Sequence, residues 1–138
     1  MNYLDKIKKD GRGANPFFCL MGIEVVSFGD GGAVLKMQVR PDMQNGAGWL
    51  QGGILVALAD EAMALAIYSQ LSKGEGIATI SESTSFIKGV RDGVVCAEAR
   101  VIRKGRRVAF CEGEVRAENA EKALLTRTSA AFAMTLAK

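Results

Sequence analysis

The chain has 138 residues, of which 49% are hydrophobic and 24% charged, and its formal net charge is +3. This length and balance predict one globular domain over residues 1–138, with a core of its own. The mild charge, without a basic stripe interleaved with aromatic residues, argues against nucleic-acid binding. The chain contains no histidine, which excludes Ser-His-Asp, Cys-His and histidine-based metal sites, so we expect no metal.

The cysteines and the apolar runs indicate the compartment. Cys19, Cys96 and Cys111 show no CxxC spacing, so we expect buried thiols in a reducing environment. Asp60 and Glu61 interrupt the longest apolar run, which leaves no candidate membrane span. No apolar stretch follows the early lysines, so a signal peptide is not expected. Together these features predict a cytoplasmic protein.

The first part of the chain predicts a helical segment followed by a β-hairpin. Residues 1–15 are polar with a short apolar set that suits one or two helical turns, so we expect a helical or flexible extension. Residues 16–22 form a hydrophobic connector. Residues 22–39 contain two strand-like runs around a glycine-rich turn at 29–32, and the second run alternates apolar with polar side chains.

The best helix candidate runs from Ile54 to about Leu71. It contains no glycine or proline and is rich in alanine and leucine. Its apolar side chains run almost all the way round, which is typical of a helix wrapped by other structure. The glycine-containing segment 73–76 is expected to end it.

The remaining chain predicts β-structure. A long strand is expected over residues 77–87, a hairpin over 94–117 with its turn at 103–107, and a closing strand over 123–136. Period-two spacing predicts that the long strand carries small hydroxyl side chains on one face: Thr79, Ser81, Ser83 and Ser85.

The predicted order is a short helix, two strands, one long buried helix and then three or four strands in meander order. This order predicts an α+β domain in which one curved antiparallel sheet wraps a long central helix. One edge of such a sheet stays exposed and invites pairing with a second copy of the chain.

Gly52 and Gly53 stand at the start of the predicted helix. The N-terminus of a helix has unpaired backbone N–H groups and a partial positive charge. Glycine lets a ligand approach that backbone closely, which suits a carbonyl oxygen that gains negative charge during acyl transfer. The alternative is that the two glycines only make a tight turn.

Asp60 and Glu61 are carboxylates inside a helix that is apolar on nearly every side. Such groups are costly there unless they are paired or functional. Adjacent helical residues point about 100° apart, so one acid can face water while the other faces the interior. The alternative is that one or both reach the surface or an interface.

The helical spacing separates these two candidate features. Nine positions from Gln51 to Asp60 give about 900° of rotation and about 13 Å of rise, which places them on nearly opposite sides of the helix. One helix therefore cannot bring Asp60 and its own Gly52 N–H to the same small carbonyl. If both act on one substrate they must come from two chains, which predicts a site at a dimer interface with two equal sites.

The pattern N-x-x-G-x-x-Q-G-G-x-x-x-x-L-x-D-x-A over residues 45–62, followed by T-x-S-x-x-x-x-F over 79–86 and a glycine-turn hairpin, resembles a known family. It is similar to the hotdog-fold acyl-CoA thioesterases of the phenylacetic-acid-degradation type, within the hydroxybenzoyl-CoA thioesterase superfamily. The resemblance covers about residues 15–138. It implies an acyl-CoA substrate, no cofactor beyond the coenzyme A of that substrate, and a homodimer with shared active sites that assembles further into a homotetramer.

The resemblance also implies roles for four residues. Asp60 matches the carboxylate that acts as general base or nucleophile. The amide of Gly52 matches the donor to the thioester carbonyl, and Asn45 matches the polar residue that helps position the water or the carboxylate. Thr79 matches the hydroxyl that holds the water, from the same chain as Asp60.

Two further features modify this interpretation. The basic turn with Lys104, Arg106 and Arg107 suits the phosphates of coenzyme A, or is simply a solvated hairpin turn. Gln51 stands where the family usually has histidine; glutamine can donate a hydrogen bond to the thioester oxygen but cannot shuttle a proton. A non-catalytic acyl-CoA-binding protein therefore remains an alternative, and an enoyl-CoA hydratase is a weaker one because that chemistry usually relies on histidine.

Overall fold

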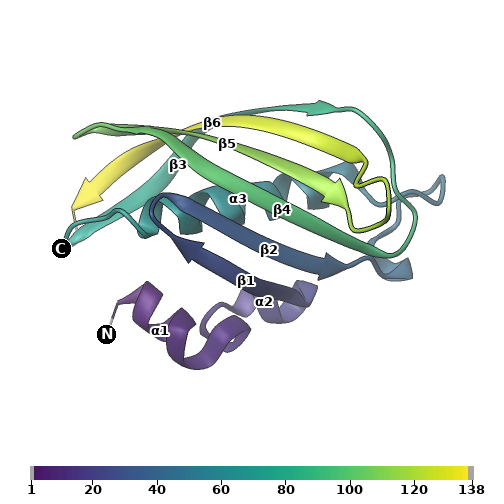
Figure 1. The fold of residues 1–138 in the computed structure, drawn as a ribbon, viewed down its shortest axis with the longest axis horizontal. Helices are drawn as coiled ribbons and strands as arrows, with labels where there is room; N and C mark the ends of the chain where they lie inside the picture. The colour runs from purple at the N-terminus through teal and green to yellow at the C-terminus, as the bar shows by residue number, and fades with distance from the viewer. Residues whose placement is uncertain (1, 137–138) are drawn as a thin grey trace.

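The computed structural model describes residues 2–136. Within them, six antiparallel strands form one sheet in the order β1-β2-β4-β5-β6-β3. The strands are β1 (Ile23–Gly29), β2 (Gly32–Gln38), β3 (Glu75–Phe86), β4 (Val94–Lys104), β5 (Val108–Ala117) and β6 (Leu124–Leu136). The long helix α3 (Gly52–Tyr68) lies along one face of the sheet (Figure 1). The predicted α+β architecture, a central helix wrapped by a curved antiparallel sheet, is confirmed.

The predicted meander is wrong for one strand. β4, β5 and β6 follow one another as neighbours, but β3 pairs with β6 and not with β4. The chain leaves β3 at one edge of the sheet and crosses to the other side, where β4 pairs with β2. The two edges are thus β1 and β3. Figure 1 shows α1 and α2 beside β1, whereas β3 has no neighbouring element on its outer side among the described residues.

The core lies between α3 and the inner face of the sheet. Apolar side chains from every side of α3 are buried: Leu55, Leu58, Ala59, Ala62, Met63, Leu65, Ala66 and Ile67. Gly113 on β5 lets the helix approach the sheet, since a Cβ there would lie 3.3 Å from Met63 Cγ. α3 starts two residues earlier than Ile54 because Gly52 and Gly53 form its first turn. It ends at Tyr68, before the predicted end at about Leu71.

The N-terminal segment is helical and packs onto the domain. Helix α1 (Tyr3–Asp10) has Asn2 as its N-cap in a reciprocal capping box with Asp5, and Ile7 is buried. It continues into a short 3₁₀ turn, η1 (Gly11–Ala14). The ring of Tyr3 meets that of Tyr68 edge-on, with centroids 5.0 Å apart. The predicted extension is therefore tied to the end of α3.

The predicted connector after it is a short helix, α2 (Pro16–Met21). Asn15 caps it by accepting hydrogen bonds from the N–H groups of Phe17 and Phe18, and Pro16 occupies the first helical position. Gly22 ends it in the left-handed region with φ of 70°. These capping residues were the sequence signal for a helix.

The expectation of buried thiols is correct for one cysteine. Cys111 is buried, and burial raises its pKa to about 12. Cys96 is half-buried on the outer side of β4. Cys19 is exposed, about 100° round α2 from the buried Phe18, and its Sγ donates to the carbonyl of Arg12.

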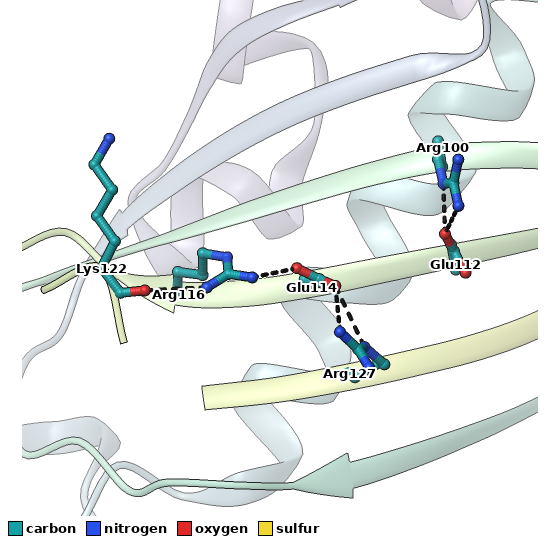
Figure 2. Close-up of polar contacts among 6 residues, drawn as sticks. All are labelled: Arg100, Glu112, Glu114, Arg116, Lys122 and Arg127. Atoms are coloured by element: carbon teal, nitrogen blue, oxygen red, sulfur yellow. Dashed lines mark hydrogen bonds and ion pairs between the residues drawn. The ribbon is translucent and has the colours of Figure 1, made fainter. Parts of the chain in front are cut away.

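The outer face of the sheet carries ion pairs, which Figure 2 shows on neighbouring strands. Glu114 accepts hydrogen bonds from Arg116 at 2.8 Å and from Arg127 at 2.9 Å, and Glu112 pairs with Arg100. The sheet is thus polar outside and apolar inside, as the predicted alternation requires. Within residues 2–136 no helix has the length and apolar character that a membrane crossing needs.

Candidate active site

The loop before α3 is closed by the side chain of Asn45. Its Oδ1 accepts hydrogen bonds from the N–H groups of Ala47 (2.9 Å) and Trp49 (3.1 Å). The Asn45 N–H donates to the Trp49 carbonyl at 2.7 Å. Gly48 has a φ of 86°, a conformation that glycine adopts without strain. Asn45 therefore shapes this loop, and its expected role toward the water or the carboxylate stays a prediction.

The start of α3 has no side-chain cap. Gln51 is the N-cap residue, but its side chain makes no capping hydrogen bond. A Cβ at Gly53 would lie 2.7 Å from Gln51 Oε1, so this side chain lies against the first turn. A Cβ at Gly52 would lie 2.9 Å from the ring of Phe86 at the end of β3. The glycines thus have a packing role here, and the first-turn N–H groups keep their capacity to bind an oxygen.

Asp60 lies midway along α3 and is half-buried, between the fully buried Ala59 and Ala62. The hydroxyl of Thr79 on β3 donates a hydrogen bond to Asp60 Oδ1 at 3.2 Å. The structure therefore brings together the two residues that the sequence assigned to one chain. Their positions on a helix and an adjacent edge strand leave the pair close to the open side of the sheet.

A β-bulge in β3 aims Thr79 at the helix. Thr79 is opposite Phe132 and Ser81 is opposite Ala131, so Ile80 is an extra residue between them. Phe132 is buried on the inner face, and residues directly opposite each other in a sheet share a face. Thr79 therefore points inward while Ser81 points outward. The expectation of one hydroxyl face is wrong for Thr79, because the bulge inverts the alternation at that point.

Glu82 is a residue of this site to which the sequence assigned no role. It is opposite the buried Ala130, so it shares the inner face with Thr79. Burial raises the pKa of Glu82 to about 8, and the neighbouring Asp60 carboxyl adds to the shift. Strict alternation puts residues 79 and 82 on opposite faces, so only the bulge places both of them next to Asp60. The signal in the sequence was a lone acid within residues 77–87.

Glu61 belongs to a second polar group beside the first. Its pKa is raised by burial and by repulsion from Asp60, against a lowering hydrogen bond from Asn15. Asn15 Nδ2 also donates to the hydroxyl of Tyr3 at 2.8 Å. These residues line an open cavity of about 290 Å³ that reaches Thr79. The two adjacent acids thus face two different environments, as their helical spacing predicts.

Asp60 and Gly52 remain apart within the chain. Both belong to one continuous helix, eight residues and about 12 Å of rise from each other. The first turn of α3 contacts Phe86, at the end of β3, whereas Asp60 contacts Thr79 near the middle of that strand. One copy of the chain therefore does not assemble the carboxylate and the amide donor at one point.

The basic turn between β4 and β5 lies near the start of β3. Lys104 Nζ pairs with Glu75 at 3.2 Å, and both side chains are partly exposed. Arg106 and Arg107 are exposed in the turn. The turn is thus at the opposite end of β3 from Gly52 within one chain, and its role toward phosphates stays a prediction. Residues 2–136 contain no group of three acidic or thiol side chains placed to hold a metal ion.

Known proteins resemble this chain over most of its length. Residues 47–124 match the Thioesterase superfamily. The acyl-coenzyme A thioesterase PaaI of Escherichia coli is 32% identical over 98 residues, which cover 69% of this chain and 66% of that protein. The structure of a conserved protein from Pseudomonas aeruginosa superposes with a TM-score of 0.81 at 31% identity, covering 88% of this chain and 94% of that one. A thioesterase from Haemophilus influenzae superposes with the same TM-score of 0.81 at 27% identity, covering 88% and 84%.

Proposed function

Because the chain belongs to the thioesterase superfamily, we propose that it is an acyl-CoA thioesterase, which splits an acyl-CoA thioester into the free acid and coenzyme A. The family and the hotdog fold expected from the sequence are confirmed by these matches. The observation that carries the proposal is the hydrogen bond from Thr79 to Asp60, a carboxylate in a buried helix beside an open strand.

The arrangement suits hydrolysis by an ionised carboxylate. Asp60 either takes a proton from water, whose oxygen then attacks the carbonyl carbon, or attacks that carbon itself. The Gly52 N–H stabilises the negative charge that develops on the carbonyl oxygen. In the first route the carbon–sulfur bond then breaks, and the proton that Asp60 took from water passes to the thiolate of coenzyme A. In the second route the same bond breaks to leave an acyl–Asp60 anhydride, which water hydrolyses to the free acid and the regenerated carboxylate, while the released proton goes to the thiolate. Thr79 orients Asp60, and through it the water.

Shared sites follow from the separation of Asp60 and Gly52. β3 is an edge strand of 12 residues with exposed apolar side chains at Ile80 and Phe86, a surface suited to pairing with another copy. Antiparallel pairing of two β3 strands about their middle would bring Asp60 of one chain toward the first turn of α3 in the other. It would also bring the basic turn at 103–107 to that end. A homodimer with two equal sites, and a homotetramer of such dimers, fit this arrangement.

The cavity beside Thr79 supports an aryl or medium-chain acyl group. It has a volume of about 290 Å³. Aromatic and aliphatic side chains line much of it, among them Tyr3, Tyr68, Ile77 and Phe132. Walls of this kind favour a flat or flexible apolar group.

The test is a panel of aryl- and alkyl-CoA esters, assayed by the release of free thiol. Asp60→Asn should lower kcat by at least about 100-fold, because an amide cannot act as a base. The matched control is Glu112→Gln on the outer face, which should leave the rate unchanged. Full activity in Asp60→Asn would overturn the assignment, and an active monomer would contradict shared sites.

The same panel separates the alternatives. Gln51, in contact with the first turn of α3, is the feature that favours a non-catalytic binding protein. Tight binding of a CoA ester without thiol release from any ester would support that function. Conversion of an enoyl-CoA to a hydrated product with the thioester intact would support a hydratase.

A further inference from the structure

Glu82 is an acid whose surroundings favour its neutral form. Its Oε1 is buried and has no hydrogen-bond partner among residues 2–136. On β6 the residue opposite Glu82 is Ala130. The next residue on the inner face of β6 is Thr128, whose hydroxyl is hydrogen-bonded to that of Thr84 at 2.9 Å. On the side of α3, the charged group that faces Glu82 and affects its carboxyl is Asp60.

An ionised Glu82 would place two negative charges side by side with one oxygen cut off from water. Such a pair is strongly unfavourable, and two carboxyls in contact relieve the repulsion by sharing one proton. Burial and the Asp60 carboxyl raise the pKa of Glu82 to about 8. Asp60 Oδ1 already accepts a hydrogen bond from the hydroxyl of Thr79, whereas Glu82 Oε1 accepts none. At neutral pH the proton of the pair therefore belongs on Glu82.

We propose that Glu82 is a positioning residue for Asp60: its protonated carboxyl donates a hydrogen bond to the Asp60 carboxylate and, together with Thr79, holds that carboxylate ionised and oriented. The inference rests on the proposed thioesterase function. It adds a second donor to the site, and both donors come from β3. Because the bulge at Ile80 places Thr79 and Glu82 on one face, the strand holds Asp60 by two contacts.

This arrangement predicts a pH response of the reaction. As the pH rises through about 8, Glu82 loses its proton, and the donor to Asp60 becomes a second negative charge. The carboxylate is then repelled from its position, so kcat/KM should fall on the alkaline side. Glu61 is the other acid near Asp60. Its pKa is also raised, but its side chain lies on the side of α3 that faces Asn15.

The experiment measures kcat and KM for thiol release between pH 6 and 10 in the unaltered enzyme, Glu82→Gln and Glu82→Leu. Glutamine keeps a donor at every pH, so Glu82→Gln should retain activity at pH 7 and lose the decline near pH 8. Leucine removes the donor, so kcat should fall about tenfold or more at all pH values with little change in KM. Glu112→Gln should keep the profile of the unaltered enzyme.

The same decline in Glu82→Gln as in the unaltered enzyme, or full kcat in Glu82→Leu, would overturn the proposal. Thermal unfolding of each variant checks that the fold is kept. A titration of the Glu82 carboxyl by ¹³C NMR provides a readout that does not depend on turnover: the Asp60→Asn variant should titrate at lower pH. If the Glu82–Asp60 pairing is seen but no ester releases thiol, the proposed thioesterase function is wrong, and the positioning role is wrong with it. If the enzyme releases thiol but the pairing is absent, only the inference about Glu82 is wrong.

Discussion

Acidic side chains on the two faces of the sheet have opposite surroundings. On the outer face, Glu114 lies between Arg116 and Arg127, and Glu112 pairs with Arg100 (Figure 2). The hydrogen bond from Arg116 and then that from Arg127 hold the pKa of Glu114 below its usual range. On this face both of these acids have a basic partner in contact with water, which is the ordinary behaviour of surface residues.

On the inner face the acids have neutral or acidic partners instead. Asp60 accepts from the hydroxyl of Thr79, and Glu82 lies beside Asp60. Burial is the first cause that raises the pKa of Glu82 and of Glu61. A fold tolerates such groups at a cost in stability, and perturbed acids of this kind gather at functional sites. The contrast therefore supports placing the proposed chemistry on the inner face and not on the outer one.

The contrast should be broken most strongly by Thr79→Val, which removes the hydroxyl that the bulge at Ile80 aims at Asp60. Asp60 then loses one of its two proposed donors, and we expect kcat to fall about 100-fold, since small misplacements of catalytic groups can have effects of that size. Thiol release from a CoA ester measures the change.

The matched variant is Ile80→Val, which keeps the bulge and a β-branched apolar side chain. Its activity should stay within about threefold of the unaltered enzyme. Circular dichroism and thermal unfolding of both variants separate a loss of folding from a loss of geometry. A folded, fully active Thr79→Val variant would show that this hydroxyl does not serve the site.

The sequence predicted those parts of the molecule that depend on local periodicity. The alternation of Leu35 and Met37 with Lys36 gives β2 its correct faces. The apolar residues around α3 predicted its burial, and two acids within it marked the position of the site. Each of these features is a periodic pattern within one helix or strand, so it can be recognised without knowing which other segments pack against that element.

The parts that sequence reasoning missed depend on pairing between distant segments. The place of β3 beside β6 is set by how α3 crosses the sheet, and no single stretch of sequence encodes it. The bulge at Ile80 becomes visible only when Thr79 is set against Phe132. Glu82 was missed for the same reason, since its nearness to Asp60 requires both the bulge and the packing of α3.

The inner face should also leave a signature in stability against pH. The pKa of Glu82 rises from an ordinary value of 4.5 to about 8 on folding, so the folded state binds more protons between these values. The free energy of unfolding should therefore decrease as the pH rises from about 4.5 to about 8, and level off above that. Glu82→Gln should remove this decrease. Urea unfolding at several pH values measures it, and an unchanged slope in Glu82→Gln would contradict the assignment.

The outer face should give the smallest effect. The pKa of Glu114 is lowered from 4.5 on folding, so its ion pairs stabilise the fold above that value and are lost as the pH falls through the folded pKa. The side chain is partly exposed, so solvent screens these pairs. Glu114→Gln should cost about 0.5–1 kcal/mol in the free energy of unfolding at pH 7, and less at high salt.

Urea unfolding at low and high salt measures the loss in Glu114→Gln, and thiol release checks that turnover is unchanged. Arg100→Gln, which removes the partner of Glu112 on the same face, is the matched control and should behave alike. A loss of several kcal/mol that does not respond to salt would mean that Glu114 is held as tightly as a buried group. A loss of turnover would mean that the outer face takes part in the reaction, and the division of labour between the two faces would then be wrong.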